Sequence, residues 1–377
     1  MSDWFTHMRR GDFAAAWKIS DEVLASRAGV ASWHLEREFQ WIWNGTPLDN
    51  KRVLIRCYHG LGDTIQFARF FPLVHAIARE STIWAQPSLI PLLATMRGIG
   101  RLLPLHDGTP EAEYDVDVES MELAHLFRTT LDTIPRDVPY LHVDPASIPR
   151  SAKRAIGVVW RAGDWGPHRS IPIDTFARLF DIPNVTFYSL QRDDRDPRLT
   201  TLEGVDEPLS TARIMRALDL VISVDTMTAH LAGALGIPVF TLLPHNADWR
   251  WMDDRNDSPW YPTMRLFRQP TEGDWDSVIE EVRYAIAMSD QTKKELSDWG
   301  IDVDKFKEKA KESLDAARGD LSEITGTLRQ TLVHAKDVVL GLQTNGAPAA
   351  AELKAGFDRA WKEIESAFRA ARDKAKS

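Results

Sequence analysis

The chain has 377 residues, of which 44% are hydrophobic and 27% are charged, which is enough for two ordinary domains and an appendage. Its net charge of −9 argues against a general nucleic-acid binder, and its single cysteine, Cys57, excludes an intrachain disulfide. No Cys/His cluster has the spacing of a structural zinc site. No apolar run approaches the roughly 20 residues that cross a bilayer, and the first residues do not read as a signal peptide. We therefore expect a cytoplasmic protein without a transmembrane segment.

Residues 1–48 are predicted to form an N-terminal helical segment. Apolar side chains such as Phe13, Ala16 and Ile19 recur at steps of three and four residues, and this pattern extends over residues 3–45. The stretch GDFAAAWKISDEVLA is similar to half a tetratricopeptide repeat, although one half-repeat cannot build a solenoid. A remnant of such a repeat and a plain capping helix both explain the pattern.

From residue 51 the pattern changes to alternating strands and helices. The first series contains the strands KRVLIRCY, TIWAQ, LLPL, YDVDVE and YLHV and the helices DTIQFARFFPLVHAIARE and PSLIPLLATMRG. A second series begins at Ala155 with the strands AIGVVW, VTFYSLQ, LVISVD and PVFTLL and with helices over 173–180, 210–218 and 227–235. Strands joined through helices indicate parallel sheets, and the polar stretch DPASIPRSAKR separates the two series. We predict an α/β fold with two Rossmann-like, doubly wound domains, residues 49–150 and 151–290, facing a cleft.

Residues 291–377 are predicted to form a helical hairpin appendage. Apolar residues repeat at steps of three and four from Phe306 to Leu342, the stretch TNGAP interrupts them, and the spacing resumes from Leu353 to Ala371. The apolar seam of the first arm is longer than the second arm can cover. We therefore expect it to dock on the N-terminal helices, on a second copy or on an acceptor protein, the alternative being a free solvated coiled coil.

The stretch CYHGLGDTIQF places one acid, Asp63, where a helix opens after the first strand. In open parallel sheets, ligands bind beyond the carboxyl ends of the strands. Gly60 and Gly62 permit a close approach of a substrate in this turn. Asp63 is either a helix cap, for which aspartate is favoured, or a general base facing the cleft, and the two roles are compatible.

A second candidate site follows the strand in ISVDTMTAHLAGALG, which ends at Asp225. Thr226, Met227 and Thr228 open the next helix, and their free backbone N–H groups make an anion site suited to a diphosphate. Many α/β proteins have Asp-Thr at such a turn, so this pattern alone is not specific.

Two neighbouring loops add candidates for the same site. The loop RAGDWGPHRSIP supplies Arg161, His168 and Arg169, and arginine forks can neutralise phosphate charge as a leaving group departs. The alternative interpretation is that both arginines are ordinary solvent-exposed side chains without a role in binding. Gln191, at the tip of the strand FYSLQ, is placed to reach a ribose or a base.

Taken together, these motifs resemble a known family. GLGDTIQFARFFPLV in the first half and SVDTMTAHLAGALGIPVF in the second resemble the bacterial ADP-heptose:lipopolysaccharide heptosyltransferases. They are more similar still to the heptosyltransferase-like glycosyltransferase domains that follow tetratricopeptide repeats. The tryptophan-rich stretch LLPHNADWRWMDDRNDSPWYPTMRLFRQP is similar to the corresponding stretch of that second group. The resemblance covers roughly residues 50–290.

The resemblance implies a GT-B fold and metal-independent sugar transfer with inversion at the anomeric carbon. It implies that Asp63 is the catalytic base and that Asp225, Thr226 and His230 bind the donor. The family's phosphate-contacting lysine aligns approximately with Arg169. The positive charge is thus kept, but the compact ammonium group of lysine is replaced by the planar guanidinium of arginine. Met227 replaces the small residue that usually follows Asp-Thr, so ADP-heptose cannot be assumed as the donor.

Two further features of the sequence each have an ordinary structural interpretation and a more specific functional one. Asp115 and Asp117 form an Asp-x-Asp pattern, which suggests a metal-bound nucleotide sugar, but acids at a strand end are usually solvated, and we expect no metal. The tryptophan-rich stretch either packs a loop against the second domain or stacks sugar rings, with Trp249 and Trp251 the best candidates for stacking.

The sequence therefore predicts an inverting GT-B glycosyltransferase of the hexosyl or heptosyl type, without a cofactor or metal. Its donor would be a nucleotide sugar and its acceptor a hydroxyl of a protein or a saccharide. Partner-like helices at both ends favour a protein acceptor. A catalytically inactive scaffold that binds a partner through the helical hairpin is the alternative, and a nucleotide-sugar epimerase on the same fold is a third possibility.

Overall fold

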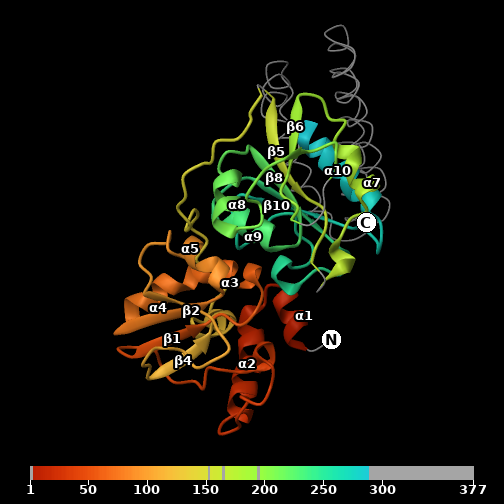
Figure 1. Cartoon of the computed structure of the whole chain (residues 1–377). Coiled ribbons are helices and arrows are strands. Elements are labelled where there is room, and N and C mark those ends of the chain that lie inside the picture. Colours follow the sequence, from red (N-terminus) through yellow and green to blue (C-terminus); the bar gives the residue numbers. More distant parts are fainter. Residues whose placement is uncertain (1–2, 152, 164–165, 193–195, 288–377) are drawn as a thin grey trace, which may run out of the picture. The chain divides into compact units, whose positions relative to one another are not determined.

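A computed structural model describes residues 3–151, 153–163, 166–192 and 196–287 (Figure 1). Both sheets belong to one compact unit, Met1–Ile279, and a second unit begins at Glu280. The helical hairpin predicted for residues 291–377 lies outside the described residues.

The first sheet has four parallel strands in the order β3-β2-β1-β4. Its strands are β1 (Arg52–Arg56), β2 (Glu80–Ala85), β3 (Arg101–Pro104) and β4 (Val116–Glu119). Leu54 and Ile55 of the central strand β1 are fully buried although they point to opposite faces, as expected for a parallel strand covered on both sides. Arg56 pairs in register with Glu119, so β1 and β4 end side by side.

The second sheet has six strands, also parallel, in the order β10-β9-β8-β5-β6-β7. Its strands are β5 (Arg154–Val159), β6 (Val185–Ser189), β7 (Thr200–Thr201), β8 (Leu220–Val224), β9 (Val239–Leu243) and β10 (Met264–Arg268). Numbered from β5 and read from the other edge, this is the 3-2-1-4-5-6 order of dinucleotide-binding folds. The predicted α/β fold with two Rossmann-like sheets is confirmed.

Helices connect these strands and precede them. They are α1 (Asp3–Arg9), α2 (Phe13–Ser26), α3 (Leu61–Phe67), α4 (Phe71–Ile77), α5 (Ile90–Leu93), α6 (Leu123–Leu126), α7 (Ile173–Phe176), α8 (Pro208–Met215), α9 (Met227–Ala234) and α10 (Trp275–Ala287). A short 3-10 helix, η7 (Trp249–Trp251), lies in the tryptophan-rich stretch. In the described part of the chain, no helix combines the length and the apolar composition that a membrane span needs.

The predicted N-terminal helical segment is confirmed only in part. Helices α1 and α2 form, but α2 is capped at Arg27, and Gly29 then adopts a positive φ of 75°. Beyond this point the only helical residues up to residue 45 are the 3-10 turn η1 (Arg37–Phe39). The indole N–H groups of Trp41 and Trp43 donate hydrogen bonds to backbone carbonyls of this irregular segment. These carbonyls are therefore bonded to side chains and not to the backbone of a helix.

Two other predictions about elements are wrong. The long helix expected after β1 is divided into α3, a 3-10 turn and α4, because Pro72 in the first turn of α4 has no N–H to continue a single helix. YLHV, residues 140–143, is not a strand. Instead, the backbone N–H of Tyr140 donates to the carbonyl of Ala234 at 3.1 Å, so this segment crosses to the end of α9.

Candidate functional site

Asp63 follows the turn between β1 and α3, and both of its carboxylate oxygens accept hydrogen bonds. Asp63 is the third residue of α3, and its Oδ2 accepts a hydrogen bond from the backbone N–H of Gly60 at 3.0 Å. Its Oδ1 accepts a hydrogen bond from Nη1 of Arg250, a residue of the tryptophan-rich stretch, at 2.7 Å. Asp63 therefore has the capping contact that the sequence suggested, and it also reaches the other half of the unit.

The turn between β8 and α9 leaves backbone donors uncapped. Thr226 is the N-cap of α9, but its side chain makes no hydrogen bond to the first turn. Its hydroxyl instead lies 3.1 Å from the hydroxyl of Ser223. The first N–H groups of a helix have no partner inside the helix, and the helix dipole adds partial positive charge at this end. The start of α9 is thus suited to an anion, and the anion site predicted from the sequence stays a prediction.

Helices α3 and α9 touch at Gly62. A Cβ atom placed on Gly62 would lie 2.9 Å from Cδ2 of His230 and 3.3 Å from Cα of Met227. Contacts this short exclude a side chain at position 62 unless the helices move apart. Gly62 therefore permits the close approach of the Gly-Asp turn to the Asp-Thr turn, and the two motifs lie together although they are far apart in the sequence.

The positive charge of Arg250 acts on the acids of both turns. Its side chain is buried, with an exposed fraction of 10%. Besides its hydrogen bond to Asp63, its Nε lies 3.0 Å from Oδ1 of Asp248, in ion-pair contact but without hydrogen-bond geometry. Burial alone would lower the pKa of Arg250, but the carboxylates of Asp248, Asp63 and Asp225 raise it. Arg250 is therefore a permanent buried cation in the site.

The two acids are shifted in opposite directions. Burial raises the pKa of Asp63, but the charge and hydrogen bond of Arg250 outweigh burial, so its pKa lies below the ordinary value. Asp225 is more completely buried, and burial raises its pKa despite the opposing charges of Arg250 and Arg169. Nη1 of Arg169 lies 3.6 Å from Oδ2 of Asp225, which brings the predicted phosphate-contacting arginine to the Asp-Thr turn.

His230 is held by aromatic side chains on two sides. Its Nδ1 lies 3.0 Å from the hydroxyl of Tyr261, and its ring stacks on Trp251 with the centroids 5.2 Å apart. Burial, reinforced by the charge of Arg250, lowers the pKa of His230 to about 3, so the imidazole is neutral near pH 7. His230 therefore contributes shape and a neutral polar edge rather than a positive charge.

The other candidates on neighbouring loops have different surroundings. Gln191 accepts from the backbone N–H of Arg161 at 3.0 Å and donates to its carbonyl at 3.3 Å, so its amide joins two strand tips. The side chains of Arg161 and His168 are exposed. Trp249 and Trp251 are buried, as the packing interpretation of the tryptophan-rich stretch predicts.

The Asp-x-Asp acids are paired with arginines. Arg52 hydrogen-bonds Asp115 and lowers its pKa to about 2, and Arg56 donates to Asp117 at 2.8 Å. Within the described ranges there is no group of three or more His, Cys, Asp or Glu side chains that could hold a metal ion.

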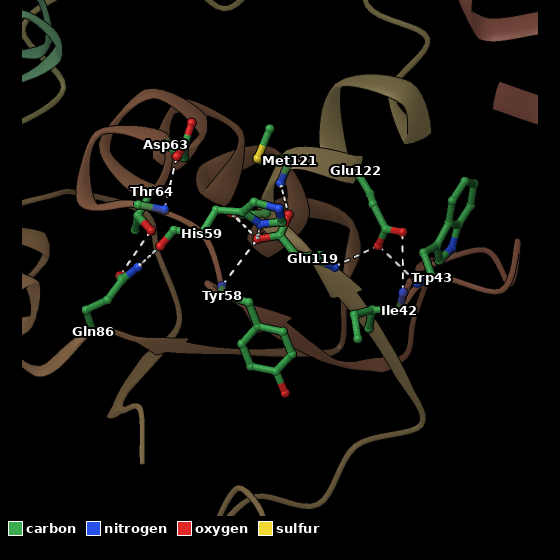
Figure 2. A network of polar contacts seen from close by, with 12 residues as sticks. Ile42, Trp43, Tyr58, His59, Asp63, Thr64, Gln86, Glu119, Met121 and Glu122 are labelled. Carbon is green, nitrogen blue, oxygen red and sulfur yellow. Dashed lines mark hydrogen bonds and ion pairs between the residues drawn. The ribbon is translucent and has the colours of Figure 1, made fainter. Parts of the chain in front are cut away.

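A histidine and a glutamate at the end of the first sheet were not predicted (Figure 2). Nδ1 of His59 lies 3.1 Å from Oε1 of the buried Glu119, in ion-pair contact but without hydrogen-bond geometry. Burial lowers the pKa of His59, but Glu119 and Asp63 outweigh burial, so the net shift is upward. His59 precedes Gly60, and Glu119 ends β4, which is the neighbour of β1, so strand-end position was the available signal for both.

Arg250 was also missed. It lies in a stretch whose tryptophans suggested packing, and its contact with Asp63 joins residues that are 187 positions apart in the sequence. No local pattern encodes a contact of this kind.

Comparison with known proteins gives distant similarities. The chain matches no protein-family model. It is 24% identical to Protein FlbA of Caulobacter vibrioides over 287 residues, which make up 65% of this chain and 48% of that protein. The chain thus spans about half the length of this curated relative.

Among solved structures, the chain is similar to glycosyltransferases. A glycosyl transferase of family 9 from Veillonella parvula aligns at 12% identity with a TM-score of 0.42, covering 59% of this chain and 87% of its own. The ADP-heptose lps heptosyltransferase II of E. coli aligns at 14% identity and a TM-score of 0.41, covering 58% and 91%. The dodecameric glycosyltransferase TibC of enterotoxigenic E. coli aligns at 16% identity and a TM-score of 0.42, covering 62% and 67%. Similarity of this size does not assign an activity, so the proposal below depends on the site residues.

Proposed function

We propose that the protein is an inverting, metal-independent glycosyltransferase that moves a sugar from a nucleotide-activated donor to a hydroxyl of a protein or a saccharide. The observation that chiefly supports this proposal is the contact of the Gly-Asp turn with the Asp-Thr turn at Gly62. It puts an ionised carboxylate, Asp63, close to a helix start suited to a diphosphate.

In the proposed reaction, Asp63 accepts the proton of the acceptor hydroxyl. The hydroxyl oxygen forms a bond to the anomeric carbon of the donor sugar. The bond from that carbon to the phosphate oxygen breaks, and the nucleoside diphosphate leaves with the electron pair. The N–H groups at the start of α9 and the guanidinium of Arg169 would stabilise the departing negative charge. These charges are supplied by the chain itself, which is why we propose that no metal is needed.

The test is sugar transfer by the full chain and its Asp63→Asn variant. Purified protein is incubated with ADP-, UDP-, GDP- and dTDP-sugars, with and without candidate acceptors, and release of the nucleoside diphosphate is followed. A positioned general base contributes about 10²–10⁴-fold, so Asp63→Asn should lower the turnover of the active combination by about 100-fold or more.

The matched control is Asp174→Asn, which removes an exposed acid from the first turn of α7 and should leave turnover unchanged. Turnover that survives Asp63→Asn would refute the assigned base. If no nucleotide or nucleotide sugar binds the protein, an inactive scaffold becomes the better description. Conversion of the donor sugar without an acceptor would instead indicate an epimerase.

A further inference from the structure

Arg250 has more negative neighbours than a single guanidinium can neutralise. It donates to Asp63 at 2.7 Å and lies 3.0 Å from Asp248, and the charge of Asp225 also acts on it. Arg169 is the nearer cation to Asp225, at 3.6 Å. The guanidinium of Arg250 thus interacts both with the acid of the Gly-Asp turn and with acids of the second half of the unit.

Part of the hydrogen-bonding capacity of Arg250 is unused. Its Nε is buried and lies 3.0 Å from Oδ1 of Asp248, but it has no partner with hydrogen-bond geometry among the described residues. A buried unpaired donor is costly, and such an atom in a candidate site suggests a partner that arrives with a ligand. The uncapped first turn of α9 supplies further donors nearby, since Met227 touches Gly62, which is next to Asp63. All of these groups favour an anionic ligand.

We propose that the diphosphate of the donor takes Arg250 away from Asp63, so that the base becomes free only when the donor is bound. This inference rests on the proposed function. In the structure one oxygen of Asp63 accepts from Gly60 and the other from Arg250, and this pairing makes the carboxylate a weak proton acceptor. A guanidinium forms strong paired hydrogen bonds with phosphate oxygens. Transfer of Arg250 to the diphosphate would remove the positive charge that suppresses the basicity of Asp63.

The proposal predicts that Asp63 and the diphosphate compete for Arg250. Calorimetric titration of the full chain with ADP, UDP, GDP and dTDP first identifies the nucleotide that binds. For that nucleotide, Asp63→Asn should tighten binding by about fivefold or more, which is the lower range of measured coupling between sites. The corresponding nucleoside, which has no phosphate, should show no such gain.

A double-substitution cycle distinguishes competition from simple repulsion. If Asp63 acts through Arg250, the gain from Asp63→Asn should disappear in the Arg250→Gln background. If Asp63 only repels the phosphates, the gain should persist there. Arg250→Lys repeats the cycle with the charge kept and the fork removed, in case the loss of the buried charge in Arg250→Gln prevents folding. Under the proposal, the gain is reduced in Arg250→Lys as well.

Two results would overturn the inference while leaving the proposed function intact. One is a nucleoside diphosphate affinity that Asp63→Asn leaves unchanged or weakens. The other is a gain of equal size with and without Arg250. Failure of every nucleotide to bind the unaltered protein would be a different result, because it would contradict the proposed function itself.

Discussion

The two acids of the site are prepared for different roles by their surroundings. Asp63 keeps 22% of its side-chain surface exposed and has a cation on one oxygen, so it stays ionised at neutral pH. Asp225 is almost fully buried, and its pKa is raised. A carboxylate with access to solvent can receive a proton from a substrate, whereas a buried one acts mainly through its hydrogen bonds and charge. This difference supports the separate roles proposed for the two residues.

Buried His230 should make the protein sensitive to acid. Because its pKa falls from 6.5 to about 3 in the folded protein, the unfolded chain binds a proton between these values while the folded protein does not. The contribution of this imidazole to stability is therefore lost as the pH falls from about 6.5 towards 3. One pKa unit corresponds to about 1.4 kcal/mol, so the full loss is on the order of 5 kcal/mol. Denaturant unfolding at pH 7 and pH 4 should show a smaller difference for His230→Gln than for the unaltered protein.

Substitution of the exposed His34 by glutamine is the control for this effect. That variant should keep the full pH dependence. An equal loss of stability in the unaltered protein and in His230→Gln would contradict the neutral, buried state of this imidazole. Asp63 also contributes below its ordinary pKa of 3.8, because its lowered pKa makes stability fall with pH there, so the comparison is not extended below pH 4.

At the scale of elements, the contact of α3 with α9 depends on a glycine. Gly62→Ala would put a Cβ 2.9 Å from His230 and 3.3 Å from the backbone of Met227, and helix backbone cannot yield without moving the helix. Overpacking of this kind typically costs about 1–3 kcal/mol. We expect Gly62→Ala to lower the free energy of unfolding by this amount and to weaken nucleoside diphosphate binding, because the two turns separate.

Gly163→Ala is the matched control, since a Cβ there meets no atom within 4 Å. Its unfolding and nucleotide affinity, measured in the same way, should stay close to those of the unaltered chain. Full nucleotide affinity and stability in Gly62→Ala would show that close approach of the two helices is not required.

The strands were largely predictable because each is a short apolar run with its own turn signals, and a buried parallel strand needs little else. The errors arose where tertiary contacts decide. The backbone N–H of Tyr140 donates to the carbonyl of Ala234 in α9 rather than to a strand, and β10 lies in the stretch whose tryptophans concealed its apolar alternation. The same reason explains why the sequence did not predict Arg250 as a site residue. Asp63, Asp225 and His230 have local motifs, whereas Arg250 is recognised only from its contacts.

At the scale of the whole compact unit, aromatic side chains join the N-terminal helices to segments that follow α6 and β9. The indole of Trp17 in α2 donates to the carbonyl of Thr129 at 2.6 Å, which fixes it to the segment after α6. Trp4 in α1 packs edge-on against Trp249 of η7 at 5.4 Å, and Phe13 lies 6.2 Å from Trp260. Helices α1 and α2 thus pack against the loop that contains Arg250. This contact explains why aromatic residues gather around that arginine.

The last prediction concerns residues 300–377, which follow the described part of the chain. Every residue assigned to the candidate site belongs to the unit Met1–Ile279, so deletion of residues 300–377 should leave nucleoside diphosphate affinity unchanged. In the sequence, the apolar repeat from Phe306 to Leu342 is longer than the repeat from Leu353 to Ala371, so we propose that its unmatched part binds a partner. The deletion should therefore weaken acceptor modification or self-association, measured by transfer assays and by light scattering. The double variant Leu314→Ser/Leu328→Ser of the full chain should reproduce the effect, because it removes two apolar residues of the repeat and keeps the length of the chain. A truncated protein that stays folded but no longer binds nucleotide would refute this separation of roles.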